Sequence, residues 1–153
     1  MMRATKKMAA KSPGKKKGPR TMAANPSAEQ LVGILRDTIV ALVRSDGADL
    51  SARQLGVFLT CYLQEGAHTV RGLAAELNVS KPAITRALDR LGELDLARRK
   101  VDPMDRRSVL VQRTLKGTAF LRSLRGTMSE AATAAKKAAA GEGSSSRRAA
   151  ANG

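Results

Sequence analysis

Residues 69–114 combine two short helical patterns with two short strand patterns, and their order constrains the fold more than any other feature of the chain. The first helical pattern, at 70–77, places its apolar residues on one face, as an amphipathic helix does. Asn78 follows it, and asparagine tolerates the left-handed backbone conformation of a tight turn. Ser80 then caps a second helix, whose first turn holds Pro82, where a missing N–H costs little. The segment therefore predicts a helix, a tight turn and a second helix.

The second helix, expected at 81–94, has two chemically different faces. Its apolar face consists of Ile84, Ala87, Leu88 and Leu91, and its opposite face carries Pro82, Ala83, Arg86, Asp89 and Arg90. From Leu96 the pattern changes, because residues 96–101 and 108–114 contain β-branched residues and flank the turn sequence Asp-Pro-Met-Asp-Arg-Arg. This pattern predicts a β-hairpin with a strongly basic tip.

Three further segments with helical periodicity surround this unit. The expected helices begin after Ser27, Ser51 and Thr114 and end at Asp46, Gly66 and Gly141. The fold class that follows is mainly α with a small β-hairpin. It is a winged helix-turn-helix at about 70–114, with flanking N- and C-terminal helices.

Composition and charge divide the chain into three parts. Residues 1–26 hold eight Lys or Arg, no acidic residue and no hydrophobic period, which predicts a disordered basic tail. Residues 27–126 are expected to form the winged domain with its flanking helices, and 127–153 an Ala-rich helix end and flexible tail. The net charge of +15 is uneven, because residues 80–126 alone hold twelve basic and five acidic residues, a local charge of +7.

A domain with one basic half suits a polyanionic partner, and the order of elements indicates double-stranded DNA. A helix-turn-helix presents the first turn of its second helix to the major groove, while a wing reaches the backbone or the minor groove. The helix residues expected at DNA are Ser80, Lys81, Pro82, Ala83, Thr85, Arg86 and Arg90. The wing residues expected there are Arg98, Arg99, Lys100, Asp105, Arg106 and Arg107. Arg86 suits a guanine and Arg90 a phosphate, and Asp105 is expected to pair with Arg107 and orient it.

Other interpretations of the same residues stay open. The charges could be solvated faces of an ordinary helical protein without a nucleic-acid partner. Among functional classes, the alternatives are a nucleoid-type architectural DNA-binding protein and a protein–protein interaction module. In the architectural alternative the basic tails supply most of the affinity, so the effect of deleting residues 1–26 separates it from a sequence-specific regulator.

Residues 69–117 resemble the winged helix of MarR-type bacterial transcription regulators. The resemblance is carried by TVRGLAAELNVSKPAITRALDRLGEL and LARRKVDPMDRRSVLVQRTLKG, and it extends less sharply to residues 28–65. Its specific part is the DPMDRR wing, followed by a Val-rich strand and a Thr-x-x-Gly helix start.

The resemblance implies a homodimer in which the N- and C-terminal helices pack together and two winged domains bind a pseudo-palindromic operator, usually as a repressor. It also implies a small-molecule effector bound between the dimer helices and the winged domain. Asp105 and Arg107 match the wing pair of the family, and residues 80–86 match its groove-reading turn. Two positions depart from the pattern: Asp95 replaces the usual glycine before the wing, and Arg113 replaces a leucine before the helix-start threonine.

Composition disfavours catalytic and metal chemistry. Cys61 is the only cysteine and His68 the only histidine, so neither an intramolecular disulfide nor a common zinc site is expected. Cys61 lies at the edge of an apolar stripe with no Lys or Arg within four residues, which favours a packed thiol over an oxidation sensor. With no phosphate-binding glycine loop and no triad, neither an enzyme nor a cofactor is expected.

The sequence contains no apolar run of the ~20 residues that span a bilayer. Its basic N-terminus lacks the apolar core of a signal peptide. These features predict no membrane partner and a cytoplasmic location, and the resemblance to bacterial DNA-binding regulators implies a bacterial, nucleoid-associated one.

Overall fold

The computed structural model describes residues 25–149, with side chains for residues 25–141. Its elements are α1 (Ala28–Arg44), α2 (Ala52–Leu63), α3 (Val70–Glu76), α4 (Lys81–Glu93), β1 (Ala97–Val101), β2 (Val109–Arg113) and α5 (Leu115–Ala149). This order confirms the mainly α fold with a winged helix-turn-helix. The predicted basic tail lies almost wholly outside the described residues.

Local capping accounts for where the first four helices begin. Ser27 and Ser51 each accept a hydrogen bond from the backbone N–H three residues on, and a glutamine at that position bonds back to the serine N–H. Thr69 and Ser80 cap α3 and α4 through their side-chain oxygens. Asn78 has a φ of 50°, so the predicted left-handed turn between α3 and α4 is confirmed.

One apolar core unites α2, α3, α4 and the base of the wing. Its largest fully buried side chains are Phe58, Leu73, Ile84, Leu88, Leu91 and Leu96. The core includes few aromatic rings, and Phe58 stacks on Tyr62 at a centroid distance of 4.4 Å and meets Phe120 edge-on at 5.2 Å. Because Phe120 belongs to α5, these rings join the long C-terminal helix to the winged domain.

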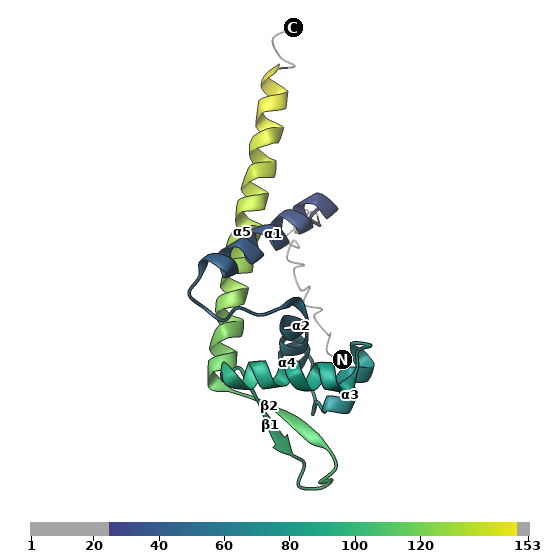
Figure 1. The fold of residues 1–153 in the computed structure, drawn as a ribbon. Coiled ribbons are helices and arrows are strands. Elements are labelled where there is room, and N and C mark those ends of the chain that lie inside the picture. The colour runs from purple at the N-terminus through teal and green to yellow at the C-terminus, as the bar shows by residue number, and fades with distance from the viewer. Residues whose placement is uncertain (1–24, 150–153) are drawn as a thin grey trace, which may run out of the picture.

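The wing is an antiparallel hairpin in which Ala97 pairs with Arg113 and Val101 with Val109. Asp95, just before β1, has a φ of 55°, so it adopts the left-handed conformation that glycine adopts at lower cost. The predicted strand bounds are confirmed to within one residue. In Figure 1 the hairpin projects at the end of the molecule opposite to the C-terminal end of α5.

Helix α5 is anchored to the winged domain through Tyr62. The Tyr62 hydroxyl donates to the carbonyl oxygen of Leu96 at 2.7 Å and accepts from the Thr114 N–H at 2.8 Å. Gly117 follows one turn later. A Cβ at this position would clash with the Tyr62 hydroxyl oxygen and with the Leu96 carbonyl oxygen. The Thr-x-x-Gly helix start is therefore a steric requirement of this junction.

Arg113, which stands where the MarR-type pattern has a leucine, makes polar contacts with α2. Its Nε donates to the carbonyl oxygen of Cys61 at 2.7 Å and its Nη2 to that of Gln64 at 2.6 Å, so it satisfies the C-terminal carbonyls of α2. Its guanidinium carbon lies 5.7 Å from the centre of the Tyr62 ring. The missing leucine is thus replaced by an arginine that ties β2 to α2.

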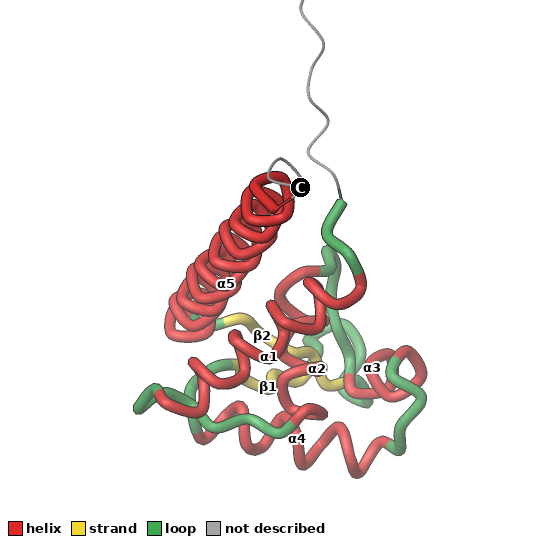
Figure 2. The backbone as a smooth tube through the Cα atoms, turned by 90° about the horizontal axis from the view of Figure 1, so that it is seen from above, coloured by secondary structure: helices red, strands yellow, loops and turns green. Residues whose placement is uncertain are grey.

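Helix α1 packs across α5 (Figure 1), and α5 runs along one side of the molecule with α3 on the other (Figure 2). Thr38 lies at this helix crossing, buried to 3% exposure, and its hydroxyl donates to the Ile34 carbonyl at 2.7 Å. Many apolar side chains of α1 are exposed: Leu31, Val32, Leu35, Ile39, Val40 and Val43. The single chain therefore leaves most of the apolar stripe of α1 uncovered.

Two predicted helix ends differ from the structure. Helix α2 ends at Leu63, three residues before Gly66, because the chain turns out of the helix at Gln64. Helix α5 continues through Gly141 to Ala149, so the predicted helix end there is wrong. A single glycine costs a helix only about 1 kcal/mol relative to alanine, and alanine has the highest helix propensity. No described helix is long and apolar enough to cross a membrane.

Candidate nucleic-acid interface

Helix α4 buries one face against the core and exposes the other, which begins at its N-terminal end. Ser80 caps it, accepting from the Ala83 N–H at 3.4 Å, and Pro82 occupies the first turn as predicted. The faces agree with the sequence with one exception. Ala83, expected beside the bases, is only 7% exposed, because it faces inward with Ile84 and Ala87. The exposed side chains of this turn are those of Lys81, Pro82 and Arg86, with Thr85 half-buried.

The predicted cations fall into two groups. Arg90 pairs with Glu93 at 3.0 Å, Arg98 pairs with Asp95 at 3.0 Å, and Arg99 pairs with Asp89 of α4. The remaining predicted cations, Lys81, Arg86, Lys100, Arg106 and Arg107, make no ion pair with a described residue. The ion-paired arginines are exposed, so each pair contributes little stability, but pairing reduces the charge they offer to a ligand.

The wing tip is organised by its two aspartates. The Asp102 carboxylate accepts from the Met104 N–H at 2.9 Å. Asp105 accepts from the Ser108 hydroxyl at 2.7 Å and from the backbone N–H of Arg107 at 3.1 Å. These two hydrogen bonds, that from Ser108 first, hold the pKa of the Asp105 carboxyl below its usual value.

The expected ion pair between Asp105 and the Arg107 guanidinium is not formed among the described residues. Asp105 instead shapes the turn through the Arg107 backbone. It therefore positions Arg107 by holding the main chain, and the guanidinium is left without a carboxylate partner. The predicted side-chain pair is therefore wrong, and the contact between these two residues is made through the Arg107 main chain.

Arg71 is a residue of this surface that the sequence analysis missed. It follows the cap Thr69 on α3 and lines a hollow of about 480 Å³ between α3, α4 and the wing. Lys81 and Arg107 line the same hollow. Arg71 stands alone in an otherwise uncharged helix start, so local charge density gave no signal. Only the folding of α3 against the wing brings it to the basic face.

Cys61 and His68 show no sign of reactivity. Cys61 is 1% exposed, and burial, only partly offset by Arg113, raises the pKa of its thiol to about 11. The thiolate is therefore scarce near neutral pH, as expected for a packed cysteine. Arg113 is remote in sequence, which explains why counting nearby cations missed it. His68 lies near the Gln64 carbonyl at 3.3 Å, and the described residues contain no group of potential metal ligands.

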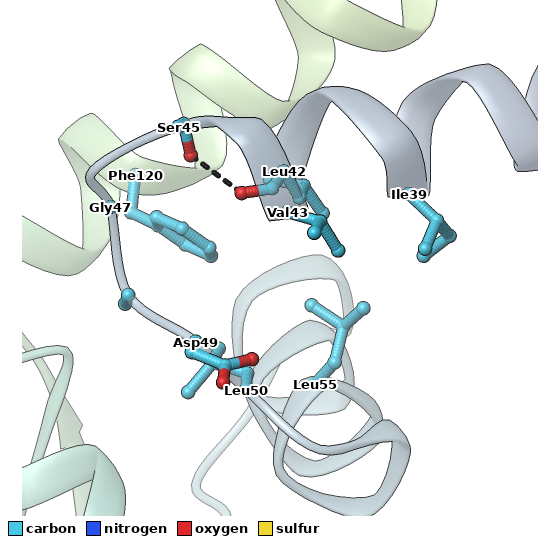
Figure 3. A pocket seen from close by; sticks show the side chains of 10 residues that line it. Ile39, Leu42, Val43, Ser45, Gly47, Asp49, Leu50, Leu55 and Phe120 are labelled. Atoms are coloured by element: carbon cyan, nitrogen blue, oxygen red, sulfur yellow. Dashed lines mark hydrogen bonds between the residues drawn. The ribbon is translucent and has the colours of Figure 1, made fainter.

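A second, smaller hollow of about 230 Å³ lies away from the wing, between α1, α2 and α5. Figure 3 shows Val43, Leu55 and Phe120 around it, with Asp49 at its edge. The Ser45 hydroxyl donates to the Leu42 carbonyl at 2.8 Å, so it is already satisfied. The hollow is mostly apolar, and Phe120 is its only aromatic lining residue.

Residues 48–108 match the sequence model of the MarR family. A crystal structure of MarR is 27% identical with a TM-score of 0.53, covering 67% of this chain and 75% of that one. A mutant of MarR from E. coli, complexed with operator DNA, is 24% identical with a TM-score of 0.53 and covers 69% of each chain. A mutant of MepR from S. aureus is 18% identical with a TM-score of 0.60, covering 82% of this chain and 93% of that one. A comparison with curated proteins gives no match.

Proposed function

We propose that the protein is a MarR-type regulator that binds an operator in double-stranded DNA and acts as a dimeric repressor, because residues 48–108 match the MarR family and a MarR crystal structure is similar over 67% of this chain. The first turn of α4 enters the major groove, where each base pair presents a distinct pattern of donors and acceptors. The wing directs Arg106 toward the adjacent minor groove and Arg107 toward the backbone that borders it. Nothing in this function requires catalysis.

The observation that carries the proposal is the exposed first turn of α4 beside an equally exposed basic wing. Arg86 is exposed and without an ion-pair partner among the described residues, so its fork of donors is available to the O6 and N7 atoms of a guanine. Lys81 and Arg107 are likewise exposed and make no ion pair with a described residue. The pair between Arg99 of the wing and Asp89 of α4 links the two elements of this surface.

An architectural role is the second candidate, and it is favoured by the eight Lys or Arg in residues 1–26. A tail of this kind adds sequence-independent affinity that falls steeply with salt. Deletion of residues 1–26 separates the two functions. We expect the truncated chain to give the same footprint at one operator, with weaker binding to all DNA. The assay is footprinting of both chains on genomic fragments at fixed salt, and loss of nearly all affinity would instead support the architectural role.

We propose that the uncovered face of α1 forms the dimer interface with the same face of a second chain. Leu35 is 56% exposed and Val43 78% exposed, and both lie on the helix that packs against α5. Such exposure of large apolar side chains along one helix marks an interaction surface. A second copy also supplies the second recognition helix that a pseudo-palindromic site requires.

Leu35→Glu is expected to yield a monomer, because a buried carboxylate at a two-fold interface meets its own copy. Glutamate and leucine have similar helix propensities, so α1 should persist. Operator affinity should fall at least about 100-fold, since one half-site remains. Leu63→Glu is the matched control, because Leu63 is 55% exposed on α2. Sedimentation velocity measures the mass, and a dimeric Leu35→Glu chain would refute this interface.

We further propose that the hollow between α1, α2 and α5 binds a small apolar effector. Its carboxylate, Asp49, disfavours anionic ligands, and its size suits a molecule of about ten heavy atoms. An effector acts only if it binds the free and DNA-bound forms with different affinity. The larger side chain of Leu55→Phe should fill the hollow. Isothermal titration calorimetry should then detect no binding of the effector to this variant. If an effector lowered operator affinity equally in the native protein and in Leu55→Phe, its binding site would lie elsewhere.

A further inference from the structure

The hollow between α3, α4 and the wing is lined by more positive than negative side chains. It is concave, has a volume of about 480 Å³, and its charged lining residues are Arg71, Lys81, Arg99, Arg107 and Asp105. Two of these five charges are occupied within the protein: Arg99 by Asp89, and Asp105 by the Ser108 hydroxyl and the Arg107 N–H. Arg71, Lys81 and Arg107 make no ion pair with a described residue and leave a positive excess in the hollow.

The walls of the hollow are fixed relative to one another. Thr69, the cap of α3, forms an isolated antiparallel bridge with Leu110 of β2. The Val111 N–H donates to the His68 carbonyl at 2.8 Å, next to this bridge. Arg71 therefore starts from a backbone that is hydrogen-bonded to the wing. On the opposite side, the pair between Arg99 and Asp89 joins the wing to α4. Because α4 also packs directly against β1, this wall does not depend on the exposed ion pair alone.

The geometry of duplex DNA indicates what fits between these walls. A single sugar–phosphate backbone separates a major groove from the neighbouring minor groove. A protein that places α4 in the first and a wing in the second must admit that backbone between the two elements. The hollow is this gap. We propose that it binds one backbone phosphodiester, held by Arg71 and Lys81 on the helix side and by Arg107 on the wing side.

This inference rests on the proposed function and deepens it, because it assigns a DNA-binding role to Arg71. A phosphate contact fixes the position of the protein on DNA but carries no sequence information. Arg71 should therefore contribute to all duplex binding, unlike Arg86, which should contribute mainly at the operator. The phosphate also lies beside Asp105, whose charge the hollow tolerates because three unpaired cations surround it.

Arg71→Ala tests the inference with the full-length dimer. We expect affinity to fall about fivefold to tenfold for each half-site, by similar factors on operator and random duplex. The slope of log affinity against log salt should decrease by about 0.9 per lost contact. Lys136→Ala removes the same charge from the exposed distal part of α5 and should change neither value. Arg71→Lys, which keeps the charge, should restore most of the affinity.

A methylphosphonate scan identifies the phosphate itself. Phosphates of the operator are replaced one at a time with a neutral group. At one position per half-site, this replacement should weaken binding by the native protein but not binding by Arg71→Ala. Unchanged affinity for Arg71→Ala, or a loss confined to the operator, would overturn the assignment. If Arg86→Ala still loses operator selectivity in that case, the proposed function stands without it. Competition by inorganic phosphate at constant ionic strength, lost in Arg71→Ala, would assign the hollow to a free anion instead.

Discussion

Gly117→Ala is expected to lower the free energy of unfolding by about 3 kcal/mol or more. The added methyl group would lie 2.6 Å from the Tyr62 ring carbon that bears the hydroxyl, and closer still to the hydroxyl and to the Leu96 carbonyl oxygen. To make room, α5 must move away from α2, which breaks the hydrogen bonds from Tyr62 to Leu96 and from Thr114 to Tyr62. Thermal unfolding at fixed protein concentration should show a decrease of roughly 10 °C in Tm.

The same helix offers the control for this variant. Gly126 has no neighbouring atom within 4 Å of the position of an added Cβ, so Gly126→Ala should be neutral or stabilising by up to about 1 kcal/mol. Tyr62→Phe should not rescue Gly117→Ala, because the Leu96 carbonyl belongs to the backbone and still blocks the methyl group. Equal stability of the Gly117→Ala and Gly126→Ala proteins would show that α5 does not approach Tyr62 as closely as described here.

Arg86→Ala is expected to weaken operator binding by about 1–3 kcal/mol for each half-site, or roughly 30-fold to 10⁴-fold for a dimer. The affinity for random duplex should fall only by the contribution of one positive charge per subunit. The difference arises because Arg86 lies exposed in the second turn of α4 without an ion-paired carboxylate among the described residues. Titration of both duplexes at one salt concentration measures both losses.

Arg90→Ala is the comparison for Arg86→Ala, because it removes an arginine one turn later on the same helix. Arg90 already pairs with Glu93, so it should contribute less and without sequence preference. If the two variants lost operator affinity equally, and random-duplex affinity by the same factor, α4 would not be reading base edges.

The sequence predicted most of the fold because its signals are local. Serine or threonine caps and the left-handed residues Asn78 and Asp95 act over three or four positions, so they can be recognised without tertiary structure. The end of α5 was mispredicted because Gly141 carries a local penalty that the surrounding alanines outweigh. The two flanking helices were expected from periodicity alone, and the structure shows that α1 leaves its apolar stripe exposed.

The candidate site was predicted less completely, because its details depend on contacts between remote residues. Arg99 pairs with Asp89 ten positions earlier, and Arg71 reaches the wing only through the bridge from Thr69 to β2. Ala83 was assigned to the wrong face because a first-turn alanine lies at the boundary between the buried and exposed sides of α4. The predicted ion pair between Asp105 and Arg107 was wrong, because a sequence motif does not distinguish a carboxylate that binds a side chain from one that binds the backbone.

The central claim is that this chain distinguishes one DNA sequence from others. Its most direct test is the ratio of the dissociation constants of the full-length protein for random duplex and for the operator selected from native genomic fragments, measured at physiological salt. We expect a ratio of about 10³ or more, as is typical of specific regulators. A ratio below about 10 for every selected fragment would contradict it and would leave only sequence-independent binding.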